Sequence, residues 1–414
     1  MSPRVVACTW IVLASSAAAE EQADALPSPL PLEYVLQRAA ERRPEVAAAT
    51  ARARAAGQRR AIVTALDDPM VFPSADHVPF MGGGADVSLT FEQRFPLSRV
   101  LTHRGSAAEA EAARLTADSK RVELDVELDA ARAFFMLQER RGLARILVEQ
   151  RALAQQMVRA ATARYGTGTG AQADVLRAEI ELSRLEALAR AAVADVSGAE
   201  AMLNAALARP AMAEIPPLDA AAVTEVPPEP AEAVRAAIDA RPELRAGRAE
   251  IDRAEADIRT MRSMYLPMGM VRTGPAYTMA DKFGWMVMVG VSIPLWRGRL
   301  NAGVAEAEAM ASMARSDLEA MQRMVSGEAA RARAEVASVR ERYVALKEQV
   351  VPKAKQAVEA SLAGYMTGQL PLVSVVEVAQ ALWMAQADVI MAEAELGIAR
   401  ARLDRAVAAR GARR

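Results

Sequence analysis

The chain has 414 residues, 25% of them charged, and a formal net charge of −1. Because it lacks the basic excess that phosphate contacts require, no nucleic-acid partner is expected. Apolar residues make up 52% of the chain but aromatic residues only 4%, a combination that favours long packed helices over an aromatic-rich globular core.

The N-terminal segment has the layout of a secretory signal peptide. Arg4 precedes an apolar stretch from Val5 to Ala14, and the small residues Ala17 and Ala19 follow at the spacing of a cleavage site. We therefore predict a signal peptide over residues 1–19 and export of the rest of the chain.

The only cysteine, Cys8, lies inside this segment, so the exported chain would have no disulfide and no thiolate metal site. No later segment offers the roughly 18 uninterrupted apolar residues of a membrane helix. A soluble periplasmic protein and an outer-membrane β-protein both fit these observations.

The rest of the sequence consists of two copies of one repeated unit. The motif RPE begins at Arg43 and again at Arg241, an offset of 198 (241 − 43), and Tyr165 and Tyr365 differ by 200 (365 − 165). Landmarks in the same order at nearly the same offset indicate an internal repeat. The predicted domains are a first repeat, a Pro-rich inter-repeat or equatorial linker and a second repeat, at residues 20–209, 210–230 and 231–414.

Each repeat has the same predicted order of elements. An opening helix of about 35 residues ends near Leu66 in the first repeat and near Tyr265 in the second. A β-hairpin, a long helix and a return helix follow, at about 69–95, 99–164 and 171–207 in the first repeat and at about 268–295, 299–364 and 371–408 in the second.

The long helices carry apolar residues at every seventh position, as at Val304, Ala311, Leu318 and Val325. Sustained heptads indicate helices packed side by side. At 1.5 Å per residue, the longest predicted helix would reach roughly 100 Å. A coiled coil or a tube requires such a length, whereas a globular core does not.

The hairpins alternate apolar and polar residues. In ADVSLTFEQRF, Val87, Leu89 and Phe91 lie on one face, and polar residues such as Ser88 and Glu92 lie on the other. About 11 residues of alternation match a transmembrane β-strand with lipid outside and water inside. Two soluble hairpins packed on another surface are the alternative. Four strands cannot close a barrel, which needs at least about 8, so several chains would share one.

Three pairs of segments carry a family resemblance. They are the repeat openings PLEYVLQRAAERRPEVAAA and AEAVRAAIDARPELRAG, the strand-to-helix corners QRFPLSR and VSIPLWRGR, and the tips YGTGTGAQADVLRAEIEL and YMTGQLPLVSVVEVAQAL. Together they resemble the TolC family of outer-membrane efflux proteins over essentially the whole mature length. The corners and the hairpins that contain Pro-Met are most similar to the branch that works with heavy-metal exporters.

The resemblance implies a mainly α fold with a small membrane β-barrel portion. Long antiparallel coiled-coil helices would form an α-barrel tunnel, and four β-strands per chain would close a 12-stranded barrel as a homotrimer. It further implies a passive duct in the outer membrane of a Gram-negative bacterium, with a large periplasmic part. The implied partners are outer-membrane lipid, a periplasmic adaptor and an inner-membrane transporter of the RND type.

The exported substrate stays open among metal ions, drugs and a secreted polypeptide, because the duct could serve a heavy-metal, multidrug or type I secretion system. A periplasmic adaptor or a structural coiled-coil protein is the alternative from a different class. An adaptor would have one helical hairpin flanked by Gly-rich β half-motifs, whereas this chain has two hairpins and lacks those motifs.

No enzymatic chemistry is expected, since nothing resembles a nucleophile motif, a phosphate loop or a metal-hydrolase helix. No catalytic residue and no cofactor are predicted. The 21 methionines could suit a soft metal but also serve as adaptable packing residues. His77 and His103 are the only histidines, and neither has a second histidine at ligand spacing. No metal site is predicted.

The Gly-containing breaks predict the helix reversals at the periplasmic tips. The resemblance suggests adaptor docking by Tyr165, Gly166, Gly168, Gly170, Tyr365 and Gly368. It also suggests a closed-state gate, formed from Asp174, Arg177, Ser374 and Glu377. The alternative for Asp174 and Glu377 is an ordinary preference for negative charge at a helix start.

Overall fold

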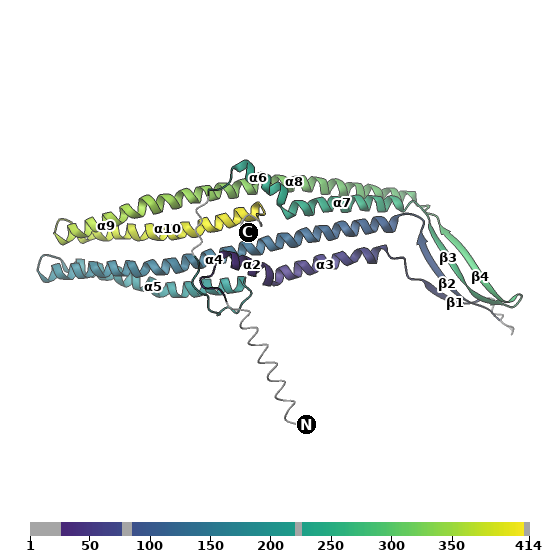
Figure 1. Cartoon of the computed structure of the whole chain (residues 1–414), viewed down its shortest axis with the longest axis horizontal. Helices are drawn as coiled ribbons and strands as arrows, with labels where there is room; N and C mark the ends of the chain where they lie inside the picture. The colour runs from purple at the N-terminus through teal and green to yellow at the C-terminus, as the bar shows by residue number, and fades with distance from the viewer. Residues whose placement is uncertain (1–25, 77–84, 220–225, 410–414) are drawn as a thin grey trace, which may run out of the picture. The chain divides into compact units, whose positions relative to one another are not determined.

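The structure is a computed structural model that describes residues 26–76, 85–219 and 226–409. The predicted signal peptide, His77 and residues 220–225 of the predicted linker lie outside the described residues. Helices dominate, and four strands complete the chain (Figure 1). The elements in order are α2 (Leu32–Arg42), α3 (Pro44–Thr64), β1 (Met70–Asp76), β2 (Asp86–Pro96), α4 (Val100–Gly166), α5 (Gln172–Ala206), α6 (Pro230–Ala240), α7 (Pro242–Ser263), β3 (Met268–Thr278), β4 (Lys282–Ser292), α8 (Arg297–Ala345), the π-helix η1 (Leu346–Val350), α9 (Val351–Met366) and α10 (Leu372–Ala406).

The opening helix of each repeat is broken into two, contrary to the expectation of one helix of about 35 residues. The break falls at Arg43 and at Arg241, whose ψ angles of 128° and 125° are extended. Each precedes a proline, whose ring disfavours the helical conformation in the residue before it. Arg43 also donates two hydrogen bonds to the Glu45 carboxylate, at 3.0 and 2.5 Å, which stabilises the start of α3. The sequence RPE therefore predicts a helix break as well as a repeat.

The two long helices differ from each other. In the first repeat α4 continues for 67 residues without interruption. In the second, the predicted helix over about 299–364 contains the π-helical segment η1, which ends two residues before Pro352. Proline has no N–H to donate and crowds the preceding turn, and a π-helical turn is one way to accommodate it. The first repeat has Ala152 at the corresponding position and keeps its regular helix.

The chain forms two compact units, each of which takes segments from both sequence repeats. The first comprises Met1–Ala47, Val122–Ala240 and Val325–Arg414, and the second comprises Ala48–Arg121 and Arg241–Met324. The compact units therefore cut across the repeats, and the two return helices, α5 and α10, contact each other.

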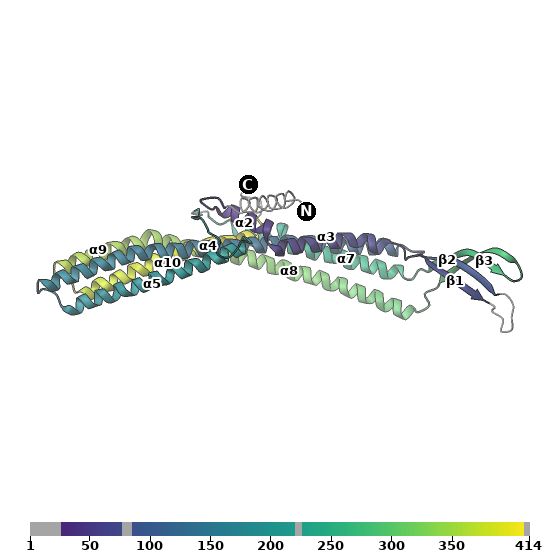
Figure 2. The same cartoon turned by 90° about the horizontal axis from the view of Figure 1, so that it is seen from below.

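The first unit contains two helical hairpins. In each one a return helix, α5 or α10, runs back beside the helix that precedes it (Figures 1 and 2). One core cluster near the turns includes Met157, Leu185, Tyr365 and Trp383, so both hairpins contribute to a single core. Small residues let the helices approach closely.

Helix α10 is strongly apolar. By length and composition alone it could cross a membrane, contrary to the expectation that no later segment could do so. Its side chains contribute to all three core clusters of the first unit, among them Trp383, Ala394 and Leu403. Packing therefore accounts for part of its apolar character, since 39% of its most apolar 18-residue stretch is buried.

The second unit contains the sheet. Its strands lie in the order β1-β2-β3-β4, and all neighbours are antiparallel (Figure 1). β2 pairs with β3 across the two repeats, with Phe91 opposite Thr273, and β3 pairs with β4, with Thr273 opposite Val287. The prediction of two hairpins and four strands is confirmed. β3 forms a full 11-residue strand in spite of its glycines and proline.

Candidate channel surfaces

One face of the sheet is apolar and exposed. The alternating residues Val87, Leu89 and Phe91 of β2 each expose about half of their surface in the single chain, at 47%, 52% and 46%. On β4 the exposure is greater, and Val289 reaches 72%. Continuous exposed apolar surface of this kind marks contact with a protein partner or with a membrane.

The opposite face of the sheet holds a buried charge cluster. Glu92 is only 1% exposed and accepts hydrogen bonds from Arg94 Nε at 2.9 Å and from Arg272 Nε at 2.9 Å. Arg272 also lies over the Phe72 ring, 4.6 Å from its centre. Two guanidinium groups compensate the desolvated carboxylate. The cluster ties β2 to β3 and therefore joins the hairpins of the two repeats.

Sequence reasoning placed Glu92 on the polar face but missed Arg272. A sequence feature did set Arg272 apart, because it is the only charged residue in the stretch PMGMVRTGPAYTM. That stretch looks like a poor strand by propensity, and only the register places Arg272 opposite Glu92.

The outer edges of β1 and β4 pair with no other strand among the described residues. An unpaired edge leaves a row of backbone N–H and C=O groups without partners. In hydrocarbon these groups would each cost several kcal/mol. A sheet with an exposed apolar face and two unpaired edges therefore requires further strands if it lies in a membrane.

The Gly-containing segments form the turns of the two helical hairpins. Gly168 and Gly368 have φ angles of +75° and +82°, a left-handed conformation that glycine adopts at little cost. Gly166 has no such requirement and has no atoms within 4 Å of where a side chain would begin. Gly170 instead allows a close approach, because an added Cβ would lie 3.0 Å from Cβ of Arg164.

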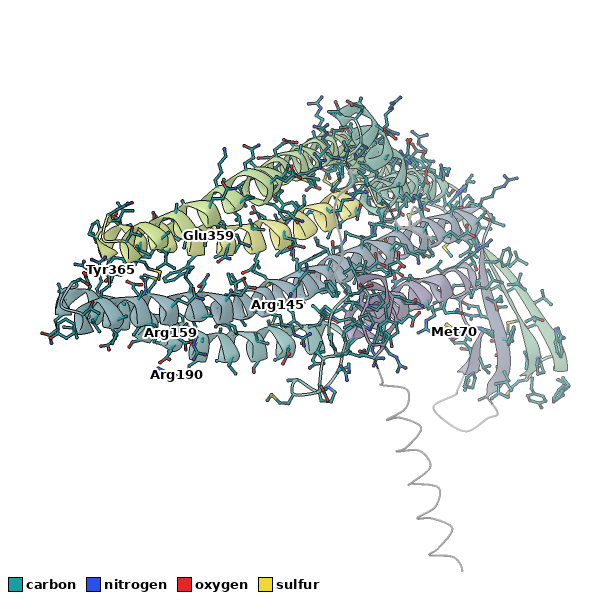
Figure 3. All side chains as sticks on the ribbon, turned by 60° about the vertical axis from the view of Figure 1, so that its left-hand side comes forward. Met70, Arg145, Arg159, Arg190, Glu359 and Tyr365 are labelled. Atoms are coloured by element: carbon teal, nitrogen blue, oxygen red, sulfur yellow. The ribbon has the colours of Figure 1, made fainter. Side chains whose placement is uncertain are left out.

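Tyr365 links the two tips. Its side chain is only 2% exposed, and in Figure 3 it lies at the end of its hairpin, on the side of the first hairpin. The Arg164 guanidinium lies 4.8 Å from the centre of the Tyr365 ring and donates a hydrogen bond to the Tyr365 carbonyl oxygen. Arg164 also donates to the Thr169 carbonyl at 3.1 Å. Sequence reasoning did not single out Arg164, whose counterpart at the 200-residue offset is Gly364.

The predicted gate residues do not form one cluster within the chain. The Tyr365 hydroxyl donates to Asp174 Oδ2 across a long 3.5 Å. Burial raises the pKa of Tyr365, and the negative charge of Asp174 raises it further, so the hydroxyl keeps its proton. Arg177 and Glu377 are exposed and make no ion pair with any described residue, while Ser374 is half-buried.

The predicted docking residues differ in their exposure to solvent. Tyr165 is 49% exposed at the turn, so its ring is accessible. Tyr365, the equivalent residue of the second repeat, is buried in the tip core instead. Its side chain is therefore not available for docking, because it packs against the first hairpin.

No group of three or more histidine, cysteine, aspartate or glutamate side chains in the described part of the chain could hold a metal ion. The surfaces described above suit contact with a membrane or with other protein chains, since they include an apolar sheet face and polar helix tips.

Solved structures share this arrangement over nearly the whole chain. The channel CusC has a TM-score of 0.80 at 15% identity, with 91% of each chain covered. The outer-membrane channel OprN has a TM-score of 0.78 at 18% identity, covering 91% of this chain and 89% of its own. The outer membrane protein VceC of Vibrio cholerae has a TM-score of 0.75 at 17% identity, covering 91% of this chain and 95% of its own.

The fold is thus that of the outer-membrane channels of TolC type, as predicted. The family model described as "Outer membrane efflux protein" matches residues 233–409, which is most of the second repeat. The second repeat is thus similar to outer-membrane efflux proteins in sequence, and nearly the whole chain shares the fold of outer-membrane channels. No curated protein matches the chain by sequence.

Proposed function

We propose that this chain is the outer-membrane channel subunit of a tripartite efflux system, a passive duct without enzymatic activity. The observation that carries the proposal is the four-stranded sheet, which has an exposed apolar face, a charged opposite face and two unpaired edges. An apolar exterior around a polar interior is the arrangement of a transmembrane β-barrel.

The barrel would be shared among copies of the chain. Three copies with four strands each would supply the 12 strands that the family resemblance implies, and every edge would then be paired. We therefore propose a homotrimer in the outer membrane of a Gram-negative bacterium, with its helical hairpins in the periplasm. The match to the outer membrane efflux protein family supports this placement.

The periplasmic tips would bind an adaptor protein that connects the duct to an inner-membrane transporter of the RND type. The accessible candidates for this contact are Tyr165, Gly166, Gly168, Gly170 and Gly368. The buried Tyr365 would contribute indirectly, by stabilising the turns through its contact with Arg164.

The same tips would close the duct at rest. Asp174 already faces the Tyr365 hydroxyl within the chain, and the exposed charges of Arg177 and Glu377, together with Ser374, would contact the neighbouring copies. Symmetry would repeat each contact in every copy. Replacing Asp174 and Glu377 by alanine should raise single-channel conductance in planar bilayers; unchanged conductance would contradict the gate.

The finer prediction concerns the cargo. We propose heavy-metal ions, on the resemblance of the corners and hairpins alone. The similarity to CusC at 15% identity does not distinguish this branch from others, since OprN is 18% identical with nearly the same TM-score. A multidrug or type I secretion duct of the same fold is the alternative. Tolerance of metals and of drugs, measured in a strain that lacks the chain and in the complemented strain, would separate them.

The duct itself is tested by its oligomeric state. Outer membranes extracted with detergent should yield a trimer whose migration changes on heating, and the purified trimer should conduct ions across a planar bilayer. A soluble periplasmic monomer without conductance would reject the duct and favour an adaptor or a structural coiled-coil protein.

A further inference from the structure

Both strand-to-helix corners repeat one pattern. Phe95-Pro-Leu-Ser-Arg99 leads into α4, and Ile293-Pro-Leu-Trp-Arg297 leads into α8, 198 residues later (297 − 99). Leu97 of the first corner and Ile293, Leu295 and Trp296 of the second are exposed, and Trp296 reaches 77%. The apolar face of the sheet therefore continues up to the corner, where arginines begin.

The arginines at the corners have no carboxylate partner among the described residues. They are Arg99, Arg104, Arg297 and Arg299, which we call the arginine collar, and all four are exposed. Arg297 lies over the ring of Tyr265, 5.4 Å from its centre, a contact that restricts the side chain while leaving its hydrogen-bond donors available.

Helix stability does not account for the collar. Neither α4 nor α8 has an acidic residue in its first turn. The start of a helix carries a partial positive charge and favours acidic side chains, so arginines there are electrostatically unfavourable. An arginine directly after the corner is present in both repeats, as Arg99 and Arg297, which points to an anionic group outside the chain.

We propose that the arginine collar binds the headgroups of anionic phospholipids in the membrane leaflet next to the helices. Arginine presents planar paired donors that match a phosphate group, and its aliphatic stem can lie along apolar surface while its head reaches the headgroups. Trp296 would lie at the same level, where tryptophan side chains prefer the boundary between acyl chains and water. The inference rests on the proposed placement of the sheet in a membrane.

The test uses Trp296 as a local reporter. The sequence has four tryptophans, of which Trp10 lies in the predicted signal peptide, so replacing Trp285 and Trp383 by phenylalanine leaves Trp296 alone in the exported chain. The full-length oligomer is reconstituted in phosphatidylcholine vesicles that contain either brominated phosphatidylglycerol or brominated phosphatidylcholine. Quenching of the Trp296 fluorescence then gives the relative affinity of this site for the two lipids.

We expect brominated phosphatidylglycerol to be preferred by about fivefold or more, because each arginine near an anionic surface contributes about a fivefold gain in affinity. Arg297→Gln/Arg299→Gln, which removes the two collar arginines nearest to Trp296 in the sequence, should lower the ratio by at least about fivefold. The matched control is Arg159→Gln/Arg190→Gln, which removes two exposed arginines from the first helical hairpin (Figure 3) and should leave the ratio unchanged.

Equal quenching by the two lipids in the unsubstituted collar would overturn the inference while leaving the membrane placement intact. Absence of quenching by either lipid would overturn the membrane placement as well. If the collar variant does not assemble, the protein with an intact collar still tests the inference. A lipid preference that depends on charge must fall when the salt concentration is raised to about 1 M. A preference that is insensitive to salt would contradict a role for the arginines.

Discussion

Replacing Arg164 by glutamine should separate the two helical tips of each chain. The substitution removes the guanidinium from the Tyr365 ring, 4.8 Å away, and removes the hydrogen bond to the Tyr365 carbonyl. A charged hydrogen bond contributes about 1.5–3 kcal/mol and a cation–π contact about 0.5–2 kcal/mol. Since Arg164 is half-buried and the two terms are not additive, we take a loss of about 2 kcal/mol.

A loss of about 2 kcal/mol corresponds to a roughly 30-fold increase in the population with separated tips. Hydrogen exchange should therefore accelerate at the amides of both turns, and the open probability of the reconstituted channel should rise. Arg159→Gln, an exposed arginine on the same helix without an ion pair among the described residues, is the control.

Tyr365→Phe is a milder substitution at the same contact, and its effect can be compared with that of Arg164→Gln. It keeps the aromatic ring and removes only the hydroxyl, whose 3.5 Å contact with Asp174 is longer than an ordinary O–H···O bond. Its effect should therefore be much smaller than that of Arg164→Gln. If Arg164→Gln behaves like Arg159→Gln, or if Tyr365→Phe has the larger effect, then Arg164 does not hold the tips together.

Gly397→Ala should lower the stability by about 1–3 kcal/mol in thermal or denaturant unfolding, because the added Cβ would lie 2.3 Å from the buried ring of Phe135. Ala208→Gly should raise the stability by about 1 kcal/mol, since this residue has a φ of 54° at the end of α5. Glu45→Gln should lower the stability near neutral pH by less than about 1 kcal/mol, because the Arg43 hydrogen bond lowers the pKa of this half-exposed carboxyl to about 2. The Glu45 contribution is present above the ordinary carboxyl pKa and is lost as the pH falls through about 2, so protein and variant should converge there.

Each of these predictions has a definite contrary outcome. Gly327→Ala is the control for the first, because it has open space and should gain about 0.5–1 kcal/mol from helix propensity; equal effects at the two glycines would contradict the packing argument. A destabilising Ala208→Gly would contradict the backbone argument. A difference between Glu45→Gln and the unsubstituted protein that grows below pH 3 would contradict the stated sign of the pH dependence.

The sequence by itself determined the elements whose cause is local. Heptads and alternation depend on the spacing of neighbouring residues, so the long helices and the four strands were predictable. Left-handed turns need glycine, so Gly168 and Gly368 marked the reversals correctly. The breaks at Arg43 and Arg241 were equally local, and the proline after each one was overlooked as a signal.

Only the tertiary structure decided which distant residues meet. The pairing of Glu92 with Arg272 depends on the register between strands of different repeats. The burial of Tyr365 but not Tyr165 depends on how two nearly equivalent hairpins pack, with Arg164 present in one and Gly364 in the other. Periodicity specifies which face of an element is apolar, but the same pattern is compatible with many partners. The choice among them comes from the packing and charge compensation of the folded chain.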